Sequence, residues 1–273
     1  MSPDLPLAFV HDVIANVQMA TGVDFGVYRQ PMLHRRIRNH MLAAGVEDEA
    51  VYVQRLREST SFVTAAIERY TIKVSRFYRD PDVFAYLAGA LRQIAAQNRC
   101  TPLRLWSAGC AHGEEAYTLA MLLEDANVPG MVVASDIDGA ALHDARLACY
   151  GESALSTLPD TWRERFLEPV HESTWMVRPA IRSRVHFMSH DLTGDRPLDQ
   201  APFDVVCCRN VLIYFQSAAQ QRALHHLLGA LHPGGTVVLG EAEWPVAPLN
   251  GTLTAVSKPL RIFRSALTTR EAA

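Results

Sequence analysis

The feature that most constrains this chain is an apolar run that leads directly into a glycine-containing loop and then into a helix-forming segment. Leu103–Trp106 predicts a short strand, Ser107–Gly113 supplies the loop, and Glu114–Glu124 has the composition of a helix. Glycines allow a tight turn and let a ligand approach the backbone closely. In open α/β sheets, ligands bind beyond the carboxyl ends of the strands. The loop alone is a weak signal, because glycines after a strand also serve as ordinary turn residues.

The same alternation continues to residue 240. Four further apolar runs predict strands: Met131–Ala134, Val185–Met188, Phe203–Cys208 and Thr236–Gly240. Two segments between them predict helices: Gly139–Cys149, capped by Asp138, and Ser217–Leu231, followed by a tight turn at His232–Gly235. Strands that alternate with helices predict a mostly parallel, doubly wound α/β sheet.

The first 74 residues predict helices and no strand. The expected helices are one that ends at Gly22, one from Pro31 to Gly45, one after the acids Glu47–Glu49, and one over Thr60–Tyr70. Asp80 and Pro81 then predict the start of a helix that reaches about residue 98. We therefore expect a helical domain over residues 1–74 and an α/β domain over residues 75–267.

Composition excludes several classes of protein. With 26 basic and 29 acidic residues the net charge is −3, which argues against a nucleic-acid-binding protein. The 5 cysteines are scattered and form no CxxC pair, so we expect neither a disulfide framework nor a metal site. The first residues lack a signal peptide, and no apolar stretch approaches the ~20 residues of a membrane span. We expect a cytoplasmic monomer without stable membrane insertion.

Acidic residues around the glycine loop indicate the kind of ligand. Asp136 follows the second strand, where dinucleotide-type sites place the acid that accepts from ribose hydroxyls. Asp136 can also be read as a cap or turn residue, but Asp138 is better placed as the helix cap. Glu114 and Glu115 lie where the loop becomes a helix; acids are favourable there without any ligand. They would nevertheless repel a phosphate and favour a cation, which argues for S-adenosylmethionine over a nicotinamide dinucleotide.

Several blocks of sequence resemble the chemotaxis-receptor glutamate O-methyltransferases, the CheR family. The matching blocks are Val74–Asp80, Leu105–Tyr117, Ala134–Asp138 and Phe203–Phe215, and Leu33–Gly45 resembles the family's basic amino-terminal helix. The resemblance spans nearly the whole chain. It implies a Rossmann-like methyltransferase domain over residues 75–267, with a small antiparallel β-subdomain at about 166–187. In some members this subdomain tethers a receptor tail.

The resemblance also implies an activity and a site. The family transfers a methyl group from S-adenosylmethionine to glutamate side chains of chemoreceptors, on the cytoplasmic helical bundle, and releases S-adenosylhomocysteine. Two residues, Arg79 and Tyr214, would face the reacting centre. The residues expected to bind the cofactor are Lys73, Ser75, Arg79, Gly109, Glu115, Asp136, Asp191, Leu192, Arg209 and Asn210.

The proposed chemistry agrees with these residue types. A glutamate carboxylate with a free pKa of about 4.3 is already ionised at neutral pH, so its methylation needs no general base. An arginine such as Arg79 can align the carboxylate by a forked hydrogen bond, and the Tyr214 hydroxyl can orient the methyl group. Outside these motifs, Arg79 would be read as a surface residue and Tyr214 as a half-buried core aromatic.

Three positions depart from the family pattern. Lys73 replaces a common asparagine, His112 replaces a threonine in the glycine loop, and Asp191 replaces an asparagine. These changes add two potential positive charges and one acid near the expected cofactor site. They are consistent with an altered cofactor affinity or with another substrate.

The segment between Arg29 and Glu47 contains several basic residues and no acidic residue. Arg35, Arg36 and Arg38 lie on the Pro31–Gly45 helix, where Arg35 and Arg38 share a face opposite Leu33 and Ile37. We expect these three arginines to dock an acidic receptor helix in a salt-sensitive manner. The plainer interpretation is a solvated helix face.

Two other functions remain open from the sequence. In the first, the chain methylates a different protein or a small carboxylate. In the second, the chain is a non-catalytic regulatory module that binds S-adenosylmethionine.

Overall fold

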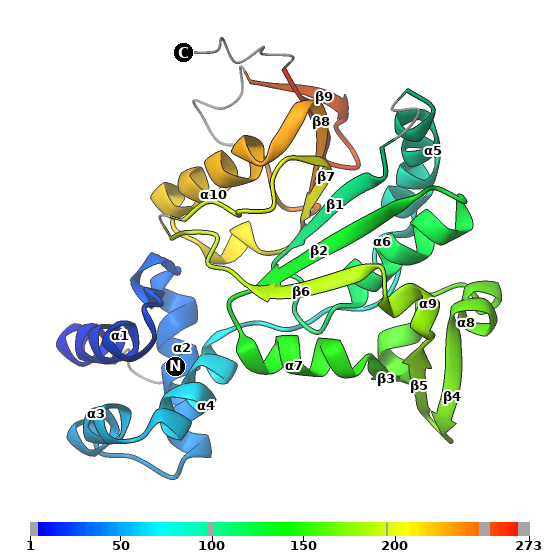
Figure 1. Ribbon diagram of the computed structural model, residues 1–273. Helices are drawn as coiled ribbons and strands as arrows, with labels where there is room; N and C mark the ends of the chain where they lie inside the picture. Colours follow the sequence, from blue (N-terminus) through cyan, green and yellow to red (C-terminus); the bar gives the residue numbers. More distant parts are fainter. Residues whose placement is uncertain (1–4, 98–100, 195, 246–251, 267–273) are drawn as a thin grey trace.

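The amino-terminal part of the chain is helical in the computed structural model, which describes residues 5–97, 101–194, 196–245 and 252–266. Its helices, which lie together at one end of the molecule (Figure 1), are α1 (Leu7–Thr21), the 3-10 turn η1 (Phe25–Val27), α2 (Gln30–Ala43), α3 (Glu49–Glu58) and α4 (Thr60–Tyr70). The prediction of an all-helical amino-terminal unit is confirmed. Among the described residues, no helix combines the length and the apolar character needed to cross a membrane.

Local capping explains where these helices begin and end. Gly22 ends α1 in the left-handed conformation, with φ 78°, as its sequence position predicts. The Asp48 carboxylate accepts a hydrogen bond from Val51 N (2.9 Å) at the start of α3. The Ser59 hydroxyl accepts one from Phe62 N (3.2 Å) at the start of α4.

The second part is an α/β domain built on a seven-stranded sheet of order β6-β2-β1-β7-β8-β10-β9. Its strands are β1 (Leu103–Ala108), β2 (Gly130–Asp136), β6 (Val185–Ser189), β7 (Phe203–Cys208), β8 (Leu231–Leu239), β9 (Leu253–Ser257) and β10 (Ile262–Ser265). Strands β6, β2, β1, β7 and β8 run parallel to one another, and β10 pairs antiparallel with both β8 and β9. The predicted doubly wound, mostly parallel sheet is confirmed, and the two closing strands are an addition to the prediction.

Helices cover the sheet on both faces (Figure 1). They are α5 (Pro81–Gln97), α6 (Glu114–Asp125), α7 (Gly139–Leu147) and α10 (Ser217–Gly229). Neighbouring strand residues enter different cores, because side chains alternate across a strand. Cys207 packs in the core that contains α5 and α6, and Cys208 packs in the core that contains α10 and the amino-terminal helices. The expectation that these two cysteines point to opposite faces is confirmed.

Two local predictions were wrong. The helix after Asp138 ends at Leu147, and Cys149 instead begins a strand, because Ala148 takes a left-handed conformation with φ 56°. The segment 232–235 is part of β8 and not a turn between elements. Residues 232–235 bulge opposite β7, since Phe203 pairs with Leu231 and Val205 with Thr236.

A small antiparallel sheet of order β3-β5-β4 lies beside the main sheet (Figure 1). Its elements are β3 (Cys149–Gly151), the 3-10 turn η2 (Glu152–Leu155), α8 (Asp160–Phe166), β4 (Leu167–His171), β5 (Thr174–Val177) and α9 (Pro179–Arg182). The sheet begins earlier than the expected range 166–187, and the end of that range, at β6, pairs with β2 of the main sheet.

The helical unit is joined to the segment that follows β7. Tyr28 forms an antiparallel bridge with Phe215, and their rings contact edge to face with centroids 5.1 Å apart. Arg29 N donates to Tyr214 O (2.9 Å). The Gln216 side chain donates to Tyr28 O (3.0 Å). The two units therefore meet at residues 214–216, which end the 3-10 turn η3 (Leu212–Tyr214) and continue towards α10.

Candidate functional site

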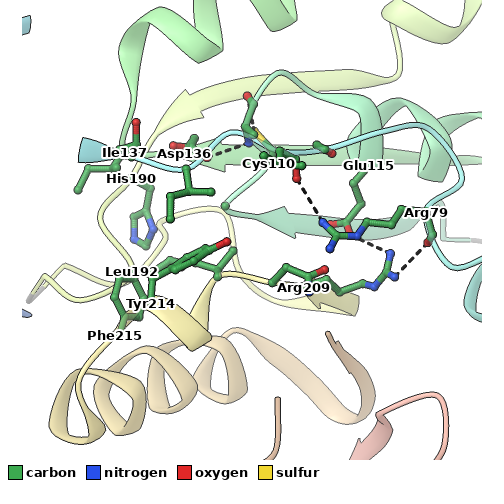
Figure 2. A pocket seen from close by; sticks show the side chains of 18 of the residues that line it. Arg79, Cys110, Glu115, Asp136, Ile137, His190, Leu192, Arg209, Tyr214 and Phe215 are labelled. Atoms are coloured by element: carbon green, nitrogen blue, oxygen red, sulfur yellow. Dashed lines mark hydrogen bonds and ion pairs between the residues drawn. The ribbon is translucent and has the colours of Figure 1, made fainter. Parts of the chain in front are cut away.

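A pocket of about 1000 Å³, partly open to solvent, lies beyond the carboxyl ends of β1, β2, β6 and β7. This is the edge at which open α/β sheets bind ligands. Figure 2 shows Arg79, Glu115 and Arg209 at one end of the pocket and Ile137, His190 and Leu192 at the other. The structure brings ten of the predicted site residues together in its lining: Ser75, Arg79, Gly109, Glu115, Asp136, Asp191, Leu192, Arg209, Asn210 and Tyr214.

The glycine loop is held against the end of β2. Gly109 N and Cys110 N both donate to Ser135 O, at 2.8 and 2.9 Å. Gly109 has φ 74°, and a Cβ at this position would lie 2.4 Å from Val211 Cγ2. Glycine is therefore required here by both backbone conformation and space.

Asp136 has a structural task besides its place in the pocket. Its Oδ2 accepts from Ala111 N (2.8 Å) and its Oδ1 from Asp138 N (3.0 Å). Burial raises its pKa, and these backbone hydrogen bonds oppose that shift. Asp138 caps α7 by accepting from Ala140 N and Ala141 N, both at 3.0 Å, so its assignment as the helix cap is confirmed. Asp136 thus sets the glycine loop relative to β2.

The Glu115 carboxylate contacts a serine hydroxyl and forms an ion pair with an arginine. Its Oε1 accepts from Ser107 Oγ (2.7 Å), and its Oε2 lies 3.4 Å from Arg209 Nη1. Burial raises the pKa of Glu115, and the Arg209 guanidinium acts in the opposite direction. The sequence predicted Glu115 to be available to a cationic ligand; in the structure its carboxylate already has a cationic neighbour, Arg209.

Arg209 connects three segments at this end of the pocket. Its side chain is only 3% exposed. Its Nη2 donates to Arg79 O (3.0 Å) and pairs with the Asp80 carboxylate, while its guanidinium lies 5.3 Å from the Phe84 ring centroid. Asp80 precedes α5 as predicted, and its pairing with Arg209 was not foreseen. The Arg79 side chain reaches back to Val74 O (3.2 Å) and lines the pocket.

Three buried polar atoms in the pocket lining have no hydrogen-bond partner among the described residues: Asn210 Oδ1, His190 Nδ1 and Arg209 Nε. His190 Nε2 lies 3.1 Å from Arg196 O, a carbonyl that can only accept, so Nε2 carries the proton and Nδ1 is an acceptor. Burial lowers the pKa of His190, which favours this neutral form. Polar atoms of this kind are normally satisfied by a ligand or water. The sequence analysis missed His190.

Asp191 lies in the pocket wall next to this histidine. Its Oδ1 accepts from both the backbone N and the hydroxyl of Thr193, at 2.8 Å each. An aspartate at this position therefore closes a local turn, which an asparagine could also do through its side-chain oxygen.

Lys73 and His112 do not line the pocket. Lys73 Nζ forms an ion pair with Asp138 Oδ2 at 2.7 Å, beside the α7 cap. His112 Nδ1 lies 3.5 Å from Asp144 Oδ2 on α7. The positive charges that the sequence placed near the cofactor site are instead directed towards α7.

The three arginines of α2 lie outside the pocket lining. Arg35 is exposed and Arg36 and Arg38 are half-buried, while Leu33 and Ile37 are fully buried, as the helical spacing predicts.

The backbone N of Arg29, which immediately precedes α2, donates to Tyr214 O (2.9 Å), so the basic helix begins beside the pocket wall. Burial lowers the pKa of Arg36, followed by repulsion from Arg35, and the neighbouring Tyr214 opposes the shift. The basic helix is thus adjacent to the residue expected at the reacting centre.

Two buried carboxylates near the pocket, Glu114 and Glu243, were not among the predicted site residues. Glu114 is 4% exposed; burial raises its pKa to about 7, and a hydrogen bond from Ser75 opposes this shift. Glu243 is 3% exposed and contacts the segment that follows β7. No sequence motif marks Glu243, because its contacts join distant parts of the chain. Within the described ranges, His, Cys, Asp and Glu form no group of three that could hold a metal ion.

Family comparisons match both units of the chain. The model described as "CheR methyltransferase, all-alpha domain" matches residues 11–71, and that described as "CheR methyltransferase, SAM binding domain" matches residues 73–257.

Individual relatives cover most of this chain. The "Chemotaxis protein methyltransferase" of Salmonella typhimurium is 31% identical over 83% of this chain and 80% of its own length. The "Probable biofilm formation methyltransferase WspC" of Pseudomonas putida is 35% identical over 81% of this chain and 53% of its own length. An "Uncharacterized 104.1 kDa protein in hypE 3'region" of Rhodobacter capsulatus is 35% identical over 85% of this chain. The chain spans 25% of that protein's length, so some relatives carry much additional sequence.

Proposed function

Because this chain belongs to the CheR methyltransferase family, we propose that it is an S-adenosylmethionine-dependent protein-glutamate O-methyltransferase. Its substrates are glutamate side chains of chemoreceptors or receptor-like proteins, and S-adenosylhomocysteine is released. The observation that carries the proposal is the convergence of Glu115, Asp136, Asn210 and the Gly109 turn on one pocket. The name of the Salmonella typhimurium relative supports chemotaxis as the setting.

The pocket suits S-adenosylmethionine on three counts. Gly109 leaves the backbone accessible where a side chain would clash with Val211. Asp136 lies at the end of β2, where a carboxylate can accept from ribose hydroxyls. Asn210 Oδ1 and His190 Nδ1 are buried acceptors that lack partners in the described structure, and the amino groups of the cofactor are donors. We propose that the remaining lining residues expected from the sequence, Ser75 and Leu192 among them, complete this site.

The bound cofactor supplies an electrophilic methyl group on a positively charged sulfur. The residues of the chain have only to bind, align and exclude water, because the acceptor carboxylate is ionised at neutral pH without a base. We assign the alignment of that carboxylate to Arg79, whose guanidinium can form a fork. We assign the orientation of the methyl group to Tyr214, which lies across the pocket on η3.

We further propose a division of labour between the two units. Residues 1–74 dock the substrate through Arg35, Arg36 and Arg38, and residues 75–267 carry the cofactor and the chemistry. The adjacency of Arg36 and Tyr214 supports this division. Four cysteines are unpaired in the described part of the chain, which suits a reducing cytoplasm, and we propose that the protein acts there as a monomer.

A second acceptor class follows from another relative. The name of the Pseudomonas putida protein refers to biofilm formation, so receptor-like proteins outside chemotaxis are the alternative substrates. The chemistry at the pocket is the same in both cases.

The decisive experiment uses the full chain, S-adenosylmethionine labelled in its methyl group, and membranes that carry single chemoreceptors or receptor-like proteins. We expect methyl label on the receptor that is released by mild base, as a methyl ester is. A receptor whose acceptor glutamates are replaced by alanine is the matched control and should take no label. Cofactor binding without transfer to any acceptor would contradict the proposal and favour a regulatory binding module.

A further inference from the structure

Glu243 lies in the turn after β8 with its carboxylate directed at the backbone of the segment that follows β7. Its Oε1 accepts from Val211 N (2.9 Å) and Ile213 N (3.3 Å). Its Oε2 accepts from Asn210 N (3.0 Å) and Gly240 N (2.6 Å). The side chain is 3% exposed. Hydrogen bonds to an ionised acceptor are about twice as strong as neutral ones, so this buried carboxylate is a strong anchor for the segment.

The anchored segment carries two of the residues assigned to the site. Asn210 takes the left-handed conformation with φ 62°, which residues other than glycine rarely adopt. Tyr214 closes the 3-10 turn that starts at Leu212. The backbone N–H groups of residues 210, 211 and 213 all donate to the buried Glu243 carboxylate, which satisfies all three.

Gly240 packs closely against the segment that Glu243 anchors. A Cβ at Gly240 would lie 2.7 Å from Asn210 N and 2.7 Å from Glu243 Oε2. The strand end, the carboxylate and the segment therefore fit together only with glycine at this position. Glu243 itself does not line the pocket, so any effect on the reaction passes through the residues that it holds.

We infer that Glu243 is a positioning residue, which holds Asn210 against the cofactor and Tyr214 at the reacting centre. The catalytic part of this inference rests on the proposed function; the part that concerns Asn210 is open to a binding measurement without any acceptor protein. Docking of the receptor, which we place on α2, does not involve the Glu243 side chain itself.

The test is Glu243→Gln, with Glu241→Gln as the matched control. The amide keeps the size of the side chain but presents an NH₂ group to two backbone donors. We expect kcat to fall about 100-fold, the loss typical of a misplacement near 1 Å, with the KM for receptor unchanged. We expect the Kd of S-adenosylhomocysteine, measured by calorimetry, to rise about tenfold through Asn210. Glu241 is exposed, and its variant should match the wild type in all three quantities.

Three further measurements separate positioning from loss of stability. Val128→Ala, in the core at the amino-terminal edge of the sheet, should lower stability without lowering kcat. Glu243→Asp keeps the charge on a shorter side chain and should recover part of the lost kcat. Glu243→Gln combined with Tyr214→Phe should lose little more than the worse single variant, because both changes act on one group.

The outcomes are distinct. A folded Glu243→Gln variant with wild-type kcat and wild-type affinity for S-adenosylhomocysteine would overturn the inference, as would losses that simply multiply in the double variant. A wild type that transfers no methyl group would instead contradict the proposed function. In that case the S-adenosylhomocysteine affinities of the Glu243 and Glu241 variants decide the positioning of Asn210.

Discussion

The buried Arg209 pairs with the partly exposed Asp80, and this contact ties the start of α5 to the end of β7. The same guanidinium lies 3.4 Å from Glu115 on α6 and donates to the backbone of Arg79. One buried cation therefore holds together segments that are far apart in the sequence. The pocket end that contains Arg79 depends on it.

We predict that Arg209→Met lowers the free energy of unfolding by about 3 kcal/mol, because Asp80 and the buried Glu115 lose their cationic partner. The measurement is urea unfolding followed by tryptophan fluorescence. Arg165→Met is the matched control: Arg165 pairs with Asp125 at 2.7 Å, but its side chain is 52% exposed. Exposed pairs contribute about 0–1 kcal/mol, so this control should change little. Equal losses in the two variants would show that burial of Arg209 adds nothing.

We predict that Arg79→Ala abolishes most methyl transfer, by about 100-fold or more in kcat, because the acceptor carboxylate loses its forked donor. The Kd of S-adenosylhomocysteine should change only a few-fold. Arg79→Lys keeps the charge without the fork and should recover little. Arg92→Ala, an exposed arginine on α5, serves as the control. Wild-type turnover in Arg79→Ala would remove Arg79 from the reacting centre.

Glu114 predicts a pH-dependent stability. Burial raises its pKa from 4.5 to about 7 in the folded state. A carboxyl group with a raised folded pKa stabilises the fold while it is protonated, below the unfolded pKa, and this contribution is lost as the pH rises through the folded pKa. The wild type should therefore lose on the order of 3 kcal/mol or less from this group between pH 5 and pH 8.5.

The comparison with Glu114→Gln isolates this contribution. The variant should equal the wild type in stability near pH 5 and exceed it near pH 8.5, as measured by urea midpoints across that range. Glu172→Gln, at an exposed turn, should follow the wild type at every pH. A difference between Glu114→Gln and the wild type that stays constant with pH would contradict the raised pKa.

We predict that Arg35→Glu raises the KM for an acidic receptor about tenfold at low salt and leaves kcat unchanged, since Arg35 is exposed on α2 and lies outside the pocket lining. The difference should shrink in about 0.5 M NaCl, because salt screens exposed charges. Arg264→Glu, an exposed charge reversal on β10, should have little effect on KM. An unchanged KM for Arg35→Glu would favour a merely solvated helix face.

The fold was predictable where local signals agreed. Thr60–Tyr70 and Phe203–Cys208 are found with the predicted bounds, because a cap or turn residue marks the ends of each segment. Strand β9 was missed because it is a short, mostly exposed strand at the sheet edge with no clear alternation of apolar and polar residues. Residues 232–235 were assigned to a turn because proline and glycine break regular pairing, which here produces a bulge within β8.

The pocket was predictable because its residues follow consecutive parallel strands, whose carboxyl ends converge at one edge. The residues that hold the pocket in place were not predictable from the sequence. Glu243 accepts from backbone N–H groups about 30 residues away, and backbone donors leave no trace in the residue types. Asp80 had a sufficient local explanation as a helix cap, which hid its pairing with Arg209. Lys73 was assigned to the cofactor by its neighbours in sequence, whereas its side chain turns to Asp138.

The contact between Arg29 N and Tyr214 O has a consequence for the choice of acceptor. Arg29 immediately precedes α2, so the proposed docking helix is joined directly to the residue assigned to the reacting centre. We expect the distance between α2 and Tyr214 to select which glutamate is methylated. Under the proposed docking on α2, we expect a glutamate to be methylated only if it lies at one set distance along the substrate from the acidic residues that bind α2, and glutamates at other spacings to remain unmethylated even when they are equally exposed.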